Sequence, residues 1–293
     1  MAFTATLIAP PGQLHSDIVE RVRDRWTGSK PRWLSVAEAA EINLTHKPED
    51  LWEVWDSLQA QRVDLVVQRS DGRRKSMLLA DMDSTMIEQE CIDELAERAG
   101  VGDRVRDITA RAMNGELNFE AALTERVALL KGLPETVIAD VLAEQITFMP
   151  GGAVLVRTMR RHGGYAALVS GGFTAFTGPV AGKLSFDEHR ANTLLVKGGF
   201  LTGEAGRPIL GREAKVDALK EITRRLGLTP EDVIAVGDGA NDLGMLGLAG
   251  TGVALHAKPS VAAECDIRIN HGDLTALLFI QGYAREEFAD ATS

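Results

Sequence analysis

The chain has 293 residues and a formal net charge of −10, and hydrophobic residues make up 45% of it, enough for one large domain or two smaller ones. No long basic cluster offsets the acidic balance, which argues against nucleic acid or an anionic membrane as the main partner. A phosphorylated small molecule is not excluded, because a local site can be positive while the whole chain is acidic.

The cysteines and the first residues predict a cytoplasmic protein. Cys91 and Cys265 do not form a CxxC pair, which disfavours a structural zinc site. We expect two reduced, buried thiols, although a disulfide between them stays open at this point. The N-terminus lacks the basic start and apolar run of a signal peptide. No apolar run approaches the roughly 20 residues that span a bilayer.

Residues 1–72 are predicted to form a separate α+β domain whose elements alternate as β-α-β-α-β. The expected strands and helices are residues 4–9, 17–26, 32–35, 49–61 and 63–68. The order resembles the ACT and ferredoxin-like modules, although it is one strand short of βαββαβ. Without a ligand signature, amino-acid binding, a structural role and dimerisation all stay open. A polar run at 70–75 predicts the linker that follows.

Residues 73–293 are predicted to form a parallel α/β domain. Short apolar runs predict buried strands, with helical patterns between them. The expected strands are residues 77–80, 166–169, 233–236 and 253–255. A mostly helical stretch at about 88–147 is predicted to be an insertion after the first of these strands, and we call it the cap. Residues 194–201, with two central glycines, predict a hairpin.

Acidic residues follow two of the predicted strands. Asp81 and Asp83 come after the first, and Asp238 and Asp242 come after a later one. In an open parallel sheet, ligands bind at the carboxyl ends of the strands, so we expect these side chains to converge. Two like charges ~4 Å apart repel by roughly 4 kcal/mol at an effective dielectric of ~20. Such a cluster needs raised pKa values or a cation, and all-oxygen ligands suit Mg²⁺.

The same region contains the residue types that phosphoryl transfer requires. A carboxylate can attack phosphorus and form an aspartyl-phosphate, provided that a cation and a lysine such as Lys215 shield the phosphate charge. Backbone N–H groups at Ser170 and Gly171, just before a short predicted helix, can hold phosphate oxygens. A second acid two residues after the nucleophile can protonate the leaving alkoxide and then activate water.

The order of these residues resembles the four motifs of the haloacid dehalogenase (HAD) superfamily. The stretch DMDST at 81–85 is similar to the first motif, and Ser170, Lys215 and the stretch GDGAND at 237–242 are similar to the other three. The resemblance is closer still to the phosphoserine phosphatases of that superfamily, and it covers residues 76–275. The combination of motifs is specific, whereas a DxDxT alone would be weak. Because every motif residue is present, an inactive homologue is disfavoured.

The resemblance implies an HAD-like fold and a role for each motif residue. Asp81 would be the nucleophile and a metal ligand, and Asp83 would be the general acid and base, with its backbone carbonyl on the Mg²⁺. Asp238 would be the third protein ligand, supported by Asp242. The residues expected to bind the phosphoryl group are Ser170, Gly171, Lys215 and Asn241.

One predicted cap helix places a cation among its apolar residues. Arg126 is in helical register with Phe119 and Leu123, on the inward edge of the helix. A cation there needs a buried partner, and the carboxylate of a substrate suits a guanidinium. An ion pair with a neighbouring acid such as Glu125 or Glu97 is the alternative.

The resemblance implies that the cap selects the substrate. Glu90 would accept the ammonium of phosphoserine, Arg126 would bind its carboxylate, and Met113 and Phe119 would close over it. The expected reaction is hydrolysis of O-phospho-L-serine, the last step of phosphorylated serine biosynthesis. Transfer to another alcohol such as homoserine, or hydrolysis of another small phosphoester, stays open. So does the choice between a monomer and a homodimer.

Overall fold

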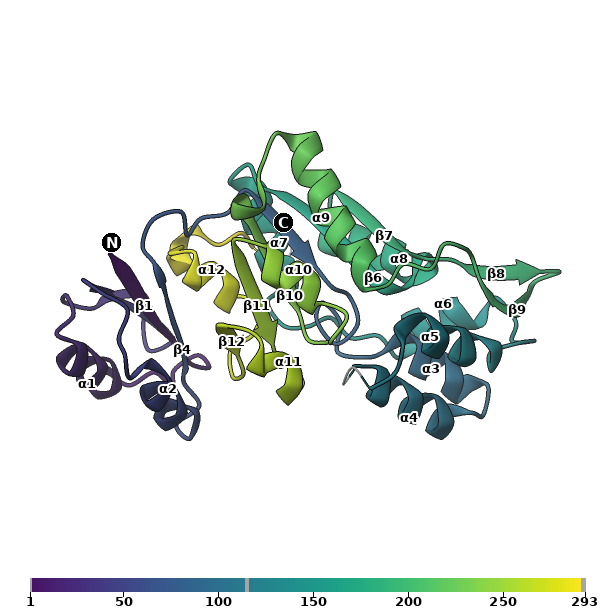
Figure 1. Ribbon diagram of the computed structural model, residues 1–293, viewed down its shortest axis with the longest axis horizontal. Coiled ribbons are helices and arrows are strands. Elements are labelled where there is room, and N and C mark those ends of the chain that lie inside the picture. The colour runs from purple at the N-terminus through teal and green to yellow at the C-terminus, as the bar shows by residue number, and fades with distance from the viewer. Residues whose placement is uncertain (1, 114–115, 291–293) are drawn as a thin grey trace.

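The computed structural model describes residues 2–113 and 116–290 and has three parts along its long axis (Figure 1). The N-terminal domain lies at one end, a parallel sheet with its helices lies in the middle, and the cap lies at the other end. Among the described residues, no helix combines the length and the apolar character needed to cross a bilayer.

The N-terminal domain is a four-stranded antiparallel sheet in the order β2-β3-β1-β4. Its elements are β1 (Phe3–Ile8), α1 (Ser16–Trp26), β2 (Arg32–Ser35), β3 (Ala39–Leu44), α2 (Leu51–Gln59) and β4 (Asp64–Arg69). The expectation that this domain lacks one strand was wrong, because β3 completes βαββαβ. The run AAEINL has helix-forming alanine and glutamate, but as a central strand it buries five of its six residues.

The two faces of this sheet are covered by different parts of the chain. Leu7 and Ile42 share a hydrophobic cluster with residues of α1 and α2. Ile8 and Val66, on the opposite face, belong to the main core of the molecule. The sheet is therefore packed against the rest of the chain on the face that its own helices leave free.

The middle of the molecule is a six-stranded parallel sheet in the order β12-β11-β10-β5-β6-β7. Its strands are β5 (Met77–Ala80), β6 (Tyr165–Phe173), β7 (Glu188–Asn192), β10 (Val233–Gly237), β11 (Thr251–Leu255) and β12 (Ile267–Ile269). All four residues of β5 are buried, as expected for a central parallel strand. The edge strands β7 and β12 were not predicted, because β7 is polar and β12 has only three residues.

Helices cover both faces of this sheet, which confirms the predicted α/β architecture. One face packs against α7 (Gly152–Arg161), α8 (Thr174–Leu184) and α12 (Ala276–Ile280). The other face packs against α9 (Arg212–Leu226), α10 (Leu243–Leu248) and α11 (Pro259–Ala263).

The cap is inserted between β5 and α7, as predicted. Its helices are α3 (Cys91–Arg98), α4 (Gly102–Met113), α5 (Phe119–Ala128) and α6 (Val137–Glu144). The predicted hairpin is formed by β8 (Leu194–Lys197) and β9 (Phe200–Ala205), and it packs beside the cap (Figure 1). Backbone hydrogen bonds between Leu201 of β9 and both Gly132 and Leu133 of the cap fix this contact.

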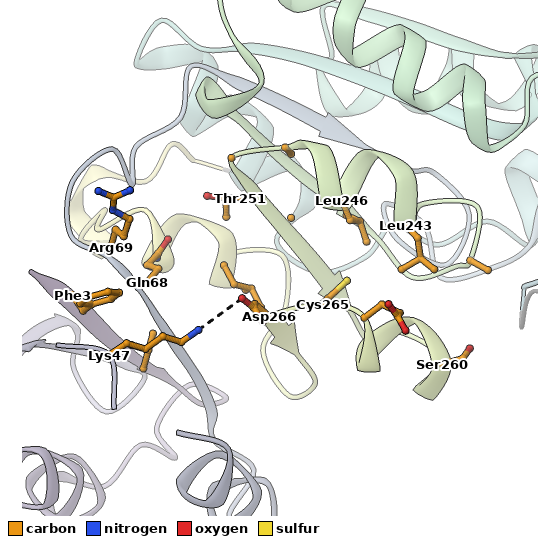
Figure 2. Close-up of a pocket in the computed structure, with 18 of the residues that line it drawn as sticks. Phe3, Lys47, Gln68, Arg69, Leu243, Leu246, Thr251, Ser260, Cys265 and Asp266 are labelled. Atoms are coloured by element: carbon orange, nitrogen blue, oxygen red, sulfur yellow. Dashed lines mark ion pairs between the residues drawn. The ribbon is translucent and has the colours of Figure 1, made fainter. Parts of the chain in front are cut away.

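A carboxylate joins the N-terminal domain to the middle sheet. Asp64 of β4 accepts backbone hydrogen bonds from Asn270 (2.8 Å), His271 (3.0 Å) and Gly272 (2.7 Å), which follow β12. Beside this contact lies a cleft of about 900 Å³ between the two parts. In Figure 2, Lys47 of the N-terminal domain faces Asp266 across the cleft, and their charged groups are 3.9 Å apart.

Candidate active site

Four carboxylates meet at the carboxyl ends of two neighbouring strands. Asp81 and Asp83 directly follow β5, and Asp238 directly follows β10, which pairs with β5. Asp242 stands at the start of α10. All four are buried, and oxygens of Asp81, Asp238 and Asp242 lie within 4.8 Å of one another. The convergence expected from the sequence is therefore present in the fold.

Lys215 neutralises part of this charge. It lies in the first turn of α9, and its Nζ is 2.5 Å from Oδ1 of Asp81 and 2.5 Å from Oδ1 of Asp242. Burial lowers the pKa of Lys215, but the carboxylates of Asp242 and Asp81 outweigh it and raise that pKa above its usual value. Lys215 is therefore a buried cation beside Asp81.

One lysine does not compensate for the whole cluster. Burial, with the charge of Asp242 as the second cause, raises the pKa of Asp81 well above its usual range and that of Asp238 to about 7. Oδ2 of Asp238 is buried and accepts no hydrogen bond from the described residues, although Nζ of Lys258 lies 3.7 Å from it. An all-oxygen site with a buried acceptor that lacks a hydrogen bond fits a hard divalent cation.

Asp242 has a different task from the other three acids. Its Oδ1 contacts Lys215, and its Oδ2 accepts the backbone N–H groups of Asp238 (3.2 Å) and Gly239 (3.0 Å). The side chain therefore shapes the loop that carries Asp238 and fixes the lysine.

Asp83 connects the core to the cap. Its Oδ1 accepts the backbone N–H of Cys91 at the start of α3 (2.9 Å), and its Oδ2 accepts the hydroxyl hydrogen of Ser170 (3.2 Å). The Ser170 hydroxyl in turn accepts the N–H of Gly172 (2.8 Å). Burial raises the pKa of Asp83, which favours its protonated form. Asp83 is thus placed to give and take a proton next to the loop at 170–172.

Two charged cap residues face the same site. Glu90 immediately precedes α3 and accepts a hydrogen bond from the hydroxyl of Ser84 (2.9 Å), and burial raises its pKa well above the usual range. Arg126 of α5 is only 2% exposed. The alternative partners of Arg126 are engaged elsewhere, Glu125 with Arg104 (3.0 Å) and Glu97 with Arg106.

A small cavity lies between the core and the cap. Its volume is about 20 Å³, close to the space for one water molecule. The residues around it include Asp81, Asp83, Glu90, Phe119, Arg126, Ser170, Gly171 and Asn241. The buried Oδ1 of Asn241 accepts no hydrogen bond from the described residues. The structure is thus a closed form, with too little space in this cavity for a phosphoester.

Phe119 forms the contact that closes the cap. Its ring packs on two glycines of the core: a methyl group added at Gly171 would lie 2.6 Å from Cζ of Phe119, and one added at Gly211 would lie 3.1 Å from Cδ1. Met113, the other predicted closing residue, ends α4, and its side chain is outside the described part of the chain.

Sequence reasoning missed Asn192, which supports the loop that contains Gly171. Its side-chain amide donates to the carbonyl oxygens of Gly171 (2.8 Å) and Leu210 (3.1 Å), and its Oδ1 accepts the N–H of Leu210 (2.7 Å). It therefore ties together the two segments on which Phe119 packs. The only sequence signal was an asparagine at the end of a polar edge strand, which is too weak to identify.

Comparison with known proteins agrees with this architecture. The model of the haloacid dehalogenase-like hydrolase family matches residues 78–247, more than half of the chain. The chain therefore belongs to the haloacid dehalogenase-like hydrolases. Within that family, it is 44% identical over 214 residues to the phosphoserine phosphatase of Lactococcus lactis, a match that covers 73% of this chain and 99% of that protein.

Other similar proteins extend the comparison. The chain is 44% identical over 219 residues to phosphoserine phosphatase SerB2 of Mycobacterium tuberculosis; the match covers 75% of this chain but only about half (53%) of that relative. A HAD family hydrolase from Salmonella enterica serovar Typhi has a TM-score of 0.85 at 28% identity and covers 98% of this chain and 99% of its own. A phosphoserine phosphatase solved as a phospho-aspartyl intermediate analogue has a TM-score of 0.67 at 40% identity, with coverages of 70% and 98%.

Proposed function

We propose that this chain hydrolyses O-phospho-L-serine to L-serine and phosphate, the last step of phosphorylated serine biosynthesis. One observation carries the proposal: Glu90 and Arg126 line the same closed cavity as Asp81. An acid and a guanidinium beside a phosphoryl-transfer site complement the ammonium and carboxylate of an amino acid. The similar protein from Lactococcus lactis, which bears the name of this activity, supports the same substrate.

In the proposed mechanism, Asp81 attacks phosphorus and becomes an aspartyl-phosphate. Lys215, 2.5 Å from this carboxylate, offsets the negative charge that otherwise opposes the attack. We propose that Mg²⁺, held by Asp81, the backbone carbonyl of Asp83 and Asp238, shields the phosphoryl oxygens when it is bound. Ser170, Gly171 and Asn241 bind the transferred group.

Asp83 handles the proton in both half-reactions. Burial raises its pKa, which favours the protonated form that can give a proton to the serine alkoxide as the ester bond breaks. The resulting carboxylate then takes a proton from the water that hydrolyses the aspartyl-phosphate. The hydrogen bonds from Cys91 and Ser170 hold Asp83 in place for both steps.

Steady-state kinetics on a panel of phosphomonoesters test the substrate. We expect kcat/KM for O-phospho-L-serine to exceed that for p-nitrophenyl phosphate and phosphoglycolate by about 100-fold or more, since those esters lack the ammonium, the carboxylate or both. Equal values would contradict the assignment. Phosphohomoserine formed on addition of homoserine would instead support transfer to a second alcohol.

We also propose that residues 1–72 form a domain distinct from the hydrolase domain at 73–293, with the cap at about 88–147. The separate hydrophobic cluster of the N-terminal domain supports this division. Amino-acid binding to that domain stays a prediction, and the cleft in Figure 2, which Phe3 and Lys47 of that domain line, is one space for it. Calorimetry of the full chain with L-serine tests it, with Arg126→Met to suppress binding at the active site. No heat at millimolar serine would remove the idea.

A further inference from the structure

A chain of hydrogen bonds connects three cap helices through Arg126. Nη1 of Arg126 on α5 donates to Oγ1 of Thr109 on α4 (3.0 Å), and this hydroxyl donates to Oδ1 of Asp93 on α3 (2.6 Å). Nε of Arg126 donates to the carbonyl oxygen of Ala122 (3.3 Å). Thr109 is 3% exposed, so its hydroxyl has little access to water as an alternative partner.

The direction of these hydrogen bonds is fixed by chemistry. Thr109 has a single hydroxyl hydrogen, and the short contact with the Asp93 carboxylate uses it. Its oxygen is therefore left to accept from Arg126, which is only a donor. The hydroxyl thus holds the guanidinium in one orientation while keeping the Asp93 carboxylate beyond ion-pair distance of Arg126.

This indirect arrangement leaves part of the guanidinium available. Among residues 2–113 and 116–290, no carboxylate forms an ion pair with Arg126, and its Nη2 donates no hydrogen bond. Arg126 also lines the cavity beside Asp81. A carboxylate in direct contact would fill the positions that a substrate carboxylate needs.

The charge balance agrees with this geometry. Burial lowers the pKa of Arg126, and the negative charges of Glu90 and Asp93 oppose that effect. Asp93 therefore helps to keep the guanidinium charged in the closed site before a substrate arrives. It does so through an intervening hydroxyl, at a distance where it does not compete for the donor atoms.

We propose that Thr109 and Asp93 are positioning residues that hold the guanidinium of Arg126 open toward the carboxylate of the substrate. The proposal rests on the proposed function, because it assumes a substrate that carries a carboxylate. We call Asp93 of α3, Thr109 of α4 and Arg126 of α5 the relay. The proposal assigns the selectivity for the substrate carboxylate to this relay.

Two esters that differ only in the carboxylate test the relay. O-phosphoethanolamine is O-phospho-L-serine without the carboxylate. A substitution that acts only through Arg126 should therefore raise KM for phosphoserine and leave KM for phosphoethanolamine unchanged. We expect Thr109→Val and Asp93→Asn each to raise KM for phosphoserine about tenfold, the loss of one hydrogen bond to a charged group. Their kcat for phosphoserine, and both constants for phosphoethanolamine, should stay within about twofold, since the chemistry at Asp81 is untouched.

Matched variants separate positioning from structural damage. Thr109→Ser restores the hydroxyl and should restore the wild-type KM. Thr124→Val removes a threonine hydroxyl from the exposed side of α5, where it donates to the backbone carbonyl oxygen of Glu120. This variant should leave kcat and KM for both substrates unchanged. Asp93→Asn removes the charge but keeps a similar shape, so it remains informative if Thr109→Val folds poorly.

The outcomes distinguish the relay from the activity itself. If the wild type prefers phosphoserine and both variants keep that preference, the relay is wrong and the proposed function stands. Equal losses on both esters would also overturn the relay, because they indicate general damage to the cap. A wild type that does not prefer phosphoserine to phosphoethanolamine would overturn the proposed function, and the relay with it.

Discussion

The core and the cap contribute to the candidate site in different ways. The core places Asp81 and Asp238 on loops at the ends of two paired strands, with Lys215 within 2.5 Å of Asp81. The cap adds Glu90, which precedes α3, and Arg126 of α5. In the proposed mechanism, the core therefore carries chemistry that any phosphomonoester can use, whereas the cap selects which ester is held. Substitutions in the core and in the cap should therefore change the kinetic constants for different esters in different ways.

The largest effect is expected in the core. Asp81→Asn removes the proposed nucleophile and should lower kcat by about 10⁴-fold or more. The loss should be as large for p-nitrophenyl phosphate as for phosphoserine, because both need the same attack. A melting curve of the variant, compared with that of the wild type, checks whether it is folded. Activity within about tenfold of the wild type would contradict the role of Asp81.

A smaller and selective effect is expected in the cap. Arg126→Met keeps the length of the side chain but removes the charge that faces the substrate carboxylate. We expect kcat/KM for phosphoserine to fall by about 100-fold, a typical loss for a buried charge pair. For p-nitrophenyl phosphate the change should be under about threefold. A uniform loss on both esters would mean that Arg126 supports the fold of the cap instead.

The aspartate cluster predicts a pH-dependent stability in the metal-free protein. Burial raises the pKa of Asp238 to about 7, so the folded state keeps a proton that the unfolded state loses near pH 4. The stabilisation is complete below that lower value and is lost as the pH rises through about 7. Between about pH 5 and pH 7.5, the melting temperature of the EDTA-treated wild type should fall by about 2–4 °C more than that of Asp238→Asn.

A divalent cation should reverse this loss. Added Mg²⁺ should raise the melting temperature of the wild type more at about pH 7.5 than at about pH 5, because protons compete with the metal for the carboxylates. Asp238→Asn should show a weaker response to the metal. An equal response at both pH values in the wild type would contradict a metal site at this cluster.

The smallest effect concerns closure of the cap. In Gly171→Ala the new methyl group would lie 2.6 Å from the ring of Phe119, so the closed form should be less populated. We expect KM for phosphoserine to rise about threefold to tenfold, a cost of about 1 kcal/mol. Gly182→Ala, with no neighbouring atom within 4 Å of its methyl group, serves as the control. Equal KM values for the two variants would contradict the closing role of Phe119.

Local patterns predicted most of the core. The apolar run of β5 was placed to the residue, because it buries a continuous apolar surface. The patterns failed for β3, whose alanine and glutamate favour a helix, and for β7, a polar edge strand. Because β7 was not predicted, Asn192 at its end was missed, and so was its support of the loop that contains Gly171.

The candidate site was likewise predicted only where it depends on local sequence patterns. The motif spacing brought Asp81, Asp83 and Asp238 together, because each follows a strand of one parallel sheet. The relay from Asp93 through Thr109 to Arg126 was not predicted, because it depends on how three helices rotate against one another. Packing between helices sets that rotation, and no local pattern reports it.

The central claim is that a bond forms between phosphorus and a carboxylate oxygen of Asp81. Acid quenching of a reaction with ³²P-labelled phosphoserine, followed by digestion and peptide mapping, tests it most directly. The account predicts label on the peptide that contains residues 81–85, and none there in Asp81→Asn. Label on another peptide, or turnover that never labels the protein, would contradict the account.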